Sequence, residues 1–207
     1  MKELSAGQWL NPPRVWEVTN DCVSFTTEPG TDLWQRTYYG FQNNNAPAYL
    51  WATDDNVTFT CSVRFDYSVL FDQAGVLVWV DEFNWIKASV EYENKEFSRL
   101  GVVVTNGGYS DWSTRNCESI GFIQFRLSQR GPDFLIEAHE GGDWEQLRIC
   151  HLGVLGETTP EMGVTPAREL PVLPVSVGVY ACSPGNASFA VEFDQIQFNA
   201  STWLPHE

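Results

Sequence analysis

The segment Trp85–Tyr92 carries the side chains with the clearest chemical potential in the chain. Its two alternating sets are Ile86, Ala88, Val90 and Tyr92, and Trp85, Lys87, Ser89 and Glu91. Successive side chains of a strand point to opposite faces of a sheet. The first set therefore indicates a core face, and the second places an ammonium group and a carboxylate together on a polar face.

Further segments repeat this alternation. Their apolar sets are Ile123, Phe125 and Leu127, then Leu147 and Ile149, and a valine series from Val175 to Val179. The polar residues opposite them include Gln124, Arg126, Arg148 and Tyr180. If these strands share one sheet, we expect their side chains to converge with Lys87 and Glu91. Hydrogen-bonding groups beside aromatic rings suit a sugar, although a solvated sheet face would show the same pattern.

The segment Gln73–Val80 is apolar apart from its first residue. An even-length turn to the next strand would place Val78 opposite Lys87 and Ala74 opposite Glu91. A bulged turn would change both pairs. With the even-length turn, Lys87 and Glu91 would lie among small apolar neighbours.

Two segments place an Asp within two residues of a Trp in a turn-like setting, Thr31–Trp34 and Tyr109–Ser113. Aromatic residues in loops often contact ligands, but they can also close the end of a sandwich core. Trp34, Asp111 and Trp112 are therefore candidate ligand-binding residues at the rim.

Glu91-Tyr92-Glu93 offers two carboxylates on one strand face, about 7 Å apart from the rise per residue. Two-carboxylate glycoside hydrolysis needs separations of roughly 5 to 10 Å. Laminarinase-type glucanases carry an alternating Glu-x-Asp-x-Glu pattern, whose third place is occupied here by Lys95. Glu91 is thus only a weak catalytic candidate.

No phosphate loop, nucleophile elbow or histidine-rich metal motif occurs, and the three histidines lack metal-ligand spacing. We therefore expect no cofactor and no metal.

Short alternating runs recur between Gly, Pro, Asn and Asp residues over the whole chain of 207 residues. The expected strands are Val15–Val18, Cys22–Thr26, Ala48–Ala52, Val57–Phe65, Gln73–Val80, Trp85–Tyr92, Gly101–Thr105, Ile120–Gln129, Phe134–His139, Trp144–Ile149, Val172–Ala181 and Ala187–Phe198. So many strands predict an all-β sandwich of two sheets, organised as a single domain over residues 1–207. The proline-rich segment Leu152–Pro174 indicates a surface loop within this domain.

The net charge is −15, without a cluster of basic residues. Such a surface repels phosphate backbones and anionic lipids, which disfavours nucleic acid and membrane partners. The first residues lack the apolar run of a signal peptide, and the five cysteines are odd in number and scattered. We therefore expect a cytoplasmic protein with reduced thiols. No sequence feature selects an oligomeric state.

An ordered series of motifs resembles a known family. The series is Thr31-Asp32-Leu33-Trp34, Asp72-Gln73-Ala74-Gly75, Trp85-Ile86-Lys87, Val90-Glu91, Val104-Thr105, Ser110-Asp111-Trp112-Ser113, Arg148 and Ser183-Pro184. It is similar to family 1349 of the domains of unknown function, the group that includes the fungal regulation-of-enolase protein, over roughly residues 8 to 200. The resemblance implies a concanavalin A-like jelly roll. It also implies that the site lies where the family pattern meets the polar face, at Gln73, Lys87, Glu91, Thr105, Asp111, Trp112 and Arg148.

Three functions fit these observations. The leading one is a lectin-like domain that binds a carbohydrate or sugar-derived small molecule on a concave sheet face. The second is a sugar-active enzyme, a glycoside hydrolase or a sugar phosphate-modifying enzyme, with Glu91 as acid or base. The third is a domain of carbohydrate metabolism that regulates by binding a protein partner through the same face.

Overall fold

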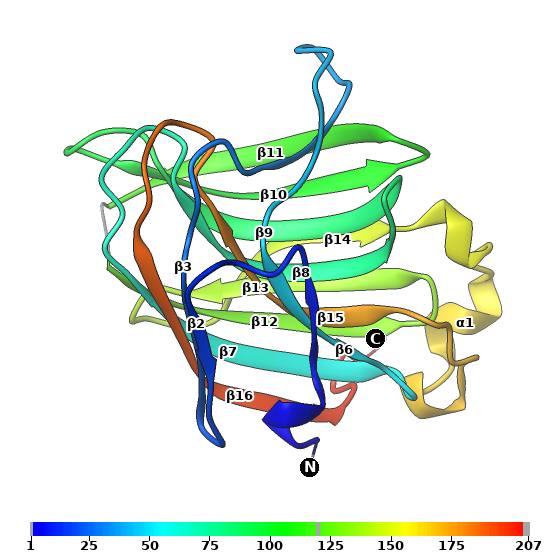
Figure 1. Ribbon diagram of the computed structural model, residues 1–207. Helices are drawn as coiled ribbons and strands as arrows, with labels where there is room; N and C mark the ends of the chain where they lie inside the picture. The colour runs from blue at the N-terminus through cyan, green and yellow to red at the C-terminus, as the bar shows by residue number, and fades with distance from the viewer. Residues whose placement is uncertain (1, 119–120, 205–207) are drawn as a thin grey trace.

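The computed structural model describes residues 2–118 and 121–204, which form two large antiparallel sheets (Figure 1). Sheet A has, in spatial order, β1 (Gln8–Leu10), β6 (Ala48–Ala52), β15 (Ser176–Cys182), β8 (Gln73–Asp81), β9 (Asn84–Tyr92), β10 (Ser98–Asn106) and β11 (Tyr109–Cys117). Sheet B has β14 (Glu145–His151), β13 (Asp133–His139), β12 (Phe122–Arg130), β7 (Val57–Phe65), β16 (Ala190–Ala200), β3 (Cys22–Thr26) and β2 (Trp16–Val18).

The remaining elements are short. A separate hairpin pairs β4 (Leu33–Gln35) with β5 (Gln42–Asn44). The helical pieces are η1 (Leu4–Ala6), η2 (Gly153–Leu155), α1 (Pro160–Val164) and η3 (Ala167–Glu169). No helix in the described ranges has the length and apolar character needed to cross a bilayer.

The main core lies between the sheets. The alternation of β9 directs Ile86, Ala88 and Val90 into it, where they join Phe59 of β7 and Phe125 of β12. All five side chains are buried, so the period-2 pattern identifies the inner face of both sheets. The expected concanavalin A-like jelly-roll sandwich of two antiparallel sheets is confirmed.

A second apolar cluster covers part of the outer face of sheet A. Its buried members are Leu33, Ala46, Ala48, Leu50, Leu77, Trp85, Val103, Tyr180 and Cys182. Leu33 and Ala46 come from the segment that contains the β4–β5 hairpin, which therefore packs on the outer face of sheet A. Trp85, expected on a polar face, is fully buried by this cover.

All twelve expected strands overlap observed ones, while β1, β4, β5 and β11 were not predicted as strands. Tyr109–Ser113, expected as a rim loop, is the first part of β11. Val172 was expected to begin a strand, but β15 begins at Ser176. Ile120, expected as the first residue of another strand, lies outside the described residues. The loop at 152–174 contains only the short helices η2, α1 and η3.

Two register shifts correct the expected pairings. Between β8 and β9 the register shifts at Trp79/Asp81, so Leu77, rather than Val78, lies opposite Lys87. The same shift places Gln73 opposite Glu91, where Ala74 was expected. A bulged strand carries one extra residue, which moves the pairing by one position. This shift makes Gln73 and Glu91 direct cross-strand neighbours.

The second shift lies between β13 and β14, at Ile136/Glu137. Beyond it Arg148 lies opposite Ile136, and Ile149 is 44% exposed. The expectation that Ile149 faces the core is therefore wrong, because the bulge reverses the alternation along β14.

Candidate functional site

Four neighbouring strands of sheet A, β8 to β11, form the floor of the site, and their register arranges it in three rows. The first row holds Gln73, Glu91 and Arg99, the second holds Gly75, Ser89 and Gly101, and the third holds Leu77, Lys87, Val103 and Trp112. The middle row contains only small residues. It therefore leaves a depression between two rows of larger side chains.

Gly101 also allows a close approach of the wall. A Cβ atom built on it would lie 2.9 Å from the Trp112 indole nitrogen and 2.6 Å from the Ser113 carbonyl oxygen. Glycine is the residue that permits such proximity. Trp112 consequently lies against the floor of the depression.

Lys87 lies in this floor with 4% of its surface exposed. Its ammonium group donates to Oε1 of Gln73 at 3.0 Å and forms an ion pair with Oδ1 of Asp32 at 3.4 Å. The Tyr180 ring centroid lies 5.8 Å away. A buried charge is costly unless it is paired and hydrogen-bonded. The surrounding groups supply both kinds of partner.

Gln73 connects this lysine to the carboxylate of the first row. Its Nε2 donates to Oε2 of Glu91 at 3.0 Å, and its Oε1 accepts from the Tyr180 hydroxyl at 3.0 Å. The Gln73 side-chain amide is thus hydrogen-bonded to Lys87, Glu91 and Tyr180 at the same time. The network fixes the orientation of the polar groups in the floor.

The β4–β5 hairpin brings Asp32 to Lys87. Asp32 accepts from its neighbour Leu33 N at 2.7 Å and from Asn43 Nδ2 at 3.3 Å, while its own backbone N–H donates to Asn45 at 2.9 Å. These bonds hold the carboxylate at the base of the hairpin. The Lys87–Asp32 ion pair therefore attaches the hairpin to sheet A.

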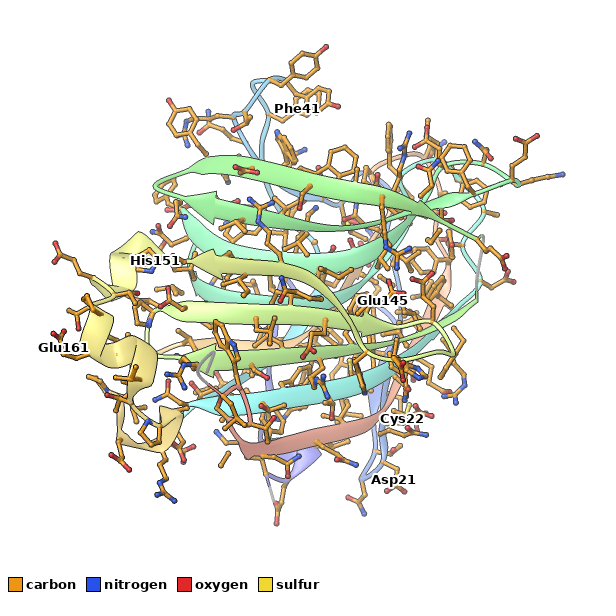
Figure 2. The ribbon with its side chains drawn as sticks, turned by 180° about the vertical axis from the view of Figure 1, so that it is seen from behind. Asp21, Cys22, Phe41, Glu145, His151 and Glu161 are labelled. Carbon is orange, nitrogen blue, oxygen red and sulfur yellow. The ribbon has the colours of Figure 1, made fainter. Side chains whose placement is uncertain are left out.

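A cavity of about 530 Å³ opens above this network, within the range of small-molecule sites. Aromatic rings form much of its wall. The lining residues are Asp32, Trp34, Tyr39, Phe41, Asn43, Phe71, Gln73, Lys87, Ser89, Glu91, Arg99, Gly101, Val103, Trp112, Pro184 and Gly185. Figure 2 shows Phe41 on the hairpin loop that projects beyond the edge of sheet A. The site combines a polar, hydrogen-bonded floor with aromatic walls.

Burial raises the pKa of Glu91 from 4.5 to about 7. Lys87 lowers this pKa, and the nearby carboxylates of Asp32 and Glu93 raise it. Because the desolvation effect is the largest, the Glu91 carboxyl exchanges its proton near neutral pH. The floor can therefore offer a hydrogen-bond donor or a carboxylate at this position.

The structure brings together half of the predicted site residues. Trp34, Gln73, Lys87, Glu91 and Trp112 line the cavity. Tyr180 is buried behind it, bonded to Gln73, and Thr105 is buried on the same sheet face with its hydroxyl 2.7 Å from that of Ser110.

Arg126 and Arg148 do not share this surface, contrary to the expected convergence. Both lie on sheet B, because β12 and β14 pair there. Arg126 forms a bidentate ion pair with Glu137, with both N–O distances at 2.6 Å. Gln124 also lies on sheet B and donates to Ser62. Alternation correctly assigned Gln124 and Arg126 to a polar face but did not show which sheet contains it, and for Arg148 the bulge in β14 reversed the alternation.

Arg148 instead joins the two sheets along a seam between β14 and β11. Its guanidinium donates to Asp111 at 3.0 Å and to Ser113 at 2.8 Å. Arg115 of β11 extends the seam by pairing with Glu140 and with Glu145, the latter at 2.9 Å. Asp111 thus participates in the seam, whereas its neighbour Trp112 points to the cavity on the opposite face.

Several lining residues were missed by the sequence analysis. Asp32 was noted only as part of a rim segment, although its carboxylate is central to the site. The run Tyr38-Tyr39-Gly40-Phe41, in a turn rich in Gly and Asn, was the available signal for an aromatic wall. Arg99 was missed because β10 begins at Ser98, three residues earlier than expected.

Within residues 2–118 and 121–204, no group of three or more His, Cys, Asp or Glu side chains is arranged to hold an ion. The polar floor is also built around a lysine, whose charge opposes a cation.

The model of the protein family of unknown function DUF1349 matches residues 9–201. The chain belongs to this family. Regulation of enolase protein 1 from Saccharomyces cerevisiae is 38% identical over 114 residues, which are 54% of this chain and 56% of that protein. The match thus spans little more than half the length of this curated relative.

Solved structures extend the comparison to the whole fold. A functionally unknown protein from Saccharomyces cerevisiae has a TM-score of 0.81 at 26% identity, covering 98% of this chain and all of that one. The glycoside hydrolase family 43 protein BlXynB from Bacillus licheniformis has a TM-score of 0.69 at 16% identity, covering 94% and 37%. The alginate lyase from Klebsiella pneumoniae has a TM-score of 0.53 at 7% identity, covering 91% and 85%. The latter two share only the fold with this chain.

Replacement of Lys87 by methionine should lower the free energy of unfolding by about 3 kcal/mol, because it leaves the Asp32 carboxylate and the Gln73 carbonyl without their buried partner. Urea unfolding measures this change. Lys95→Met is the matched control, since Lys95 is exposed. Equal stability of the two variants would contradict the role of Lys87 in the floor.

Glu91 should make the folded protein less stable as the pH rises through 7. The folded state retains the Glu91 proton up to about pH 7, whereas the unfolded chain releases it near 4.5. Between these values the folded state binds more protons, so stability falls with rising pH. The decline in melting temperature from pH 5 to pH 8 should be smaller in Glu91→Gln than in the natural protein. Parallel curves would show that Glu91 has an ordinary pKa.

Proposed function

We propose that the cavity binds a carbohydrate or a sugar-derived small molecule. The observation that carries this proposal is the position of aromatic rings above a fixed polar floor. Trp34, Tyr39 and Trp112 can stack on the C–H face of a sugar ring, while Lys87 and Glu91 in the floor can exchange hydrogen bonds with its hydroxyl groups. The aromatic wall thus matches the apolar face of a sugar, and the polar floor matches its hydroxyl groups.

The charges of the cavity favour a neutral or weakly charged ligand. Asp32 and Glu91 face Lys87 and Arg99, and the Arg99 guanidinium also pairs with Glu93 at 3.2 Å. The two signs therefore offset each other within the lining. A molecule with many hydroxyl groups can use these side chains without bringing a net charge of its own.

The fold adds support by analogy. Solved structures that share the sandwich fold include proteins named as a xylan β-1,4-xylosidase and as alginate lyases. Fold similarity alone does not transfer a function, so the local geometry carries more weight.

The cysteines at positions 22, 61, 117, 150 and 182 are all free thiols, which supports the expected cytoplasmic location.

Screening on a glycan array, followed by nuclear magnetic resonance titration with xylose and with glucose, tests the proposal. A bound sugar should shift the indole N–H signals of Trp34 and Trp112. Trp112→Ala should weaken binding about tenfold, because ring stacking contributes roughly 1 kcal/mol or more.

Trp16→Ala is the matched control, since Trp16 is 50% exposed on sheet B and Trp112 is 40% exposed on sheet A. The control should bind like the natural protein. An absence of glycan binding, or an equal loss in both variants, would refute the proposed site.

A second candidate function is catalysis on a sugar or sugar phosphate. The raised pKa of Glu91, about 7, favours it, because a general acid or base works best when its pKa is near the working pH. Lys87 lies within the same network and could stabilise negative charge.

Turnover of xylosidase and glucosidase chromogenic substrates distinguishes catalysis from binding. If the protein is an enzyme, Glu91→Gln should reduce kcat at least about a hundredfold while ligand binding is retained. If sugars bind without turnover in the natural protein, the site has a binding role alone.

A further inference from the structure

A second hollow adjoins the cavity and shares part of its wall. It has a volume of about 510 Å³ and is bordered by Trp34, Thr37, Tyr38, Tyr39, Tyr109, Ser110, Asp111 and Trp112. Trp34, Tyr39 and Trp112 line both spaces. The two hollows are therefore neighbours that share an aromatic wall, and the second reaches the edge of sheet A at β11.

The cavity crosses the strands of sheet A, and the hollow continues from its far end along β11. The cavity begins near Phe71 and Gln73, at the start of β8, and passes over β9 and β10 to Trp112 of β11. The hollow continues from Trp112 to Tyr109 at the beginning of β11. Each space alone has the size of a small-molecule site. A single sugar ring would occupy only one part of this path.

The second hollow differs from the cavity in its charges. Among its described lining residues only Asp111 carries a carboxylate, and this carboxylate is paired with Arg148 in the seam. The Ser110 hydroxyl is also engaged, by Thr105 and by the backbone N–H of Gln35. What remains for a ligand is mainly aromatic surface with tyrosine hydroxyls.

The rings of the second hollow are held open to solvent. Tyr38 is 92% exposed and contacts the Tyr39 ring, with centroids 4.8 Å apart. Tyr109 is 63% exposed and lies 5.9 Å from the Arg36 guanidinium. Arg36 donates to the Gly108 carbonyl at 3.0 Å, which ties the hairpin to the β10–β11 turn. Exposed rings held in this way provide surfaces for stacking, which tolerates different ring substituents.

We propose that the protein binds a linear, uncharged oligosaccharide, with one unit over the Lys87–Glu91 floor and further units stacked along Trp112, Tyr39 and Tyr109. This inference rests on the proposed function and extends it from a sugar to a chain of sugars. The floor recognises the hydroxyl groups of one unit, and the aromatic path holds its neighbours. Extra units add contact area without new charged contacts, as expected for the nearly neutral second hollow.

Titrations with xylose and xylotetraose, and with glucose and cellotetraose, test the length of the site. At least one tetrasaccharide should bind tenfold or more tightly than its monosaccharide, as is expected if extra units contribute about 1.4 kcal/mol. Tyr109→Ala and Tyr38→Ala should each weaken tetrasaccharide binding about fivefold, roughly the contribution of one stacked ring. Both variants should bind the monosaccharide as the natural protein does.

Tyr109→Ala also removes the ring that lies beside Arg36 of the hairpin. Tyr38→Ala is the second variant, because the Tyr38 side chain is almost fully exposed and its removal leaves the Arg36 contacts in place. Phe122→Ala, which removes a 43% exposed ring from sheet B, is the control and should leave all affinities unchanged. Equal affinity for mono- and tetrasaccharides would overturn the extended site while the cavity remained a sugar site. No shift of the Trp34 and Trp112 signals with any of the four sugars would overturn both proposals.

Discussion

Lys87 brings an ammonium group into the floor of sheet A, where water barely reaches it, and the surrounding residues are arranged to accommodate this charge. The lysine requires a carboxylate, which Asp32 supplies from the hairpin, and a neutral acceptor, which Gln73 supplies from the adjacent strand. Gln73 in turn fixes Glu91. The position of the hairpin and the orientation of the acidic group therefore both follow from one buried charge.

The register of the sheet determines the space above this charge. Because Gly75, Ser89 and Gly101 are cross-strand neighbours, the surface is low between the row of Glu91 and the row of Lys87. A one-residue change in pairing would replace these small side chains by core residues, since alternate residues face opposite sides. The bulge near Trp79 thus contributes to the site from outside it, by setting the register of β8 against β9.

The sequence predicted the sandwich, the extent of most strands and the shared face of Lys87 and Glu91, because each depends on local alternation. It could not predict which strands are neighbours, because that depends on long-range pairing. Arg126 and Arg148 were therefore assigned to the wrong sheet. The bulge in β14 also reversed the expected direction of Ile149, and a bulge has no reliable signature in a single sequence.

The seam of Arg148 with Asp111 and of Arg115 with Glu140 and Glu145 lies where β11 ends sheet A and β14 ends sheet B. Terminal strands of a sheet have unpaired backbone groups that can recruit a strand from another molecule. Charged side chains along both edges make such recruitment unfavourable, because an incoming strand would have to displace ion pairs and bury their charges. The seam thus disfavours strand addition at these two edges, which lie next to a surface rich in exposed aromatic rings.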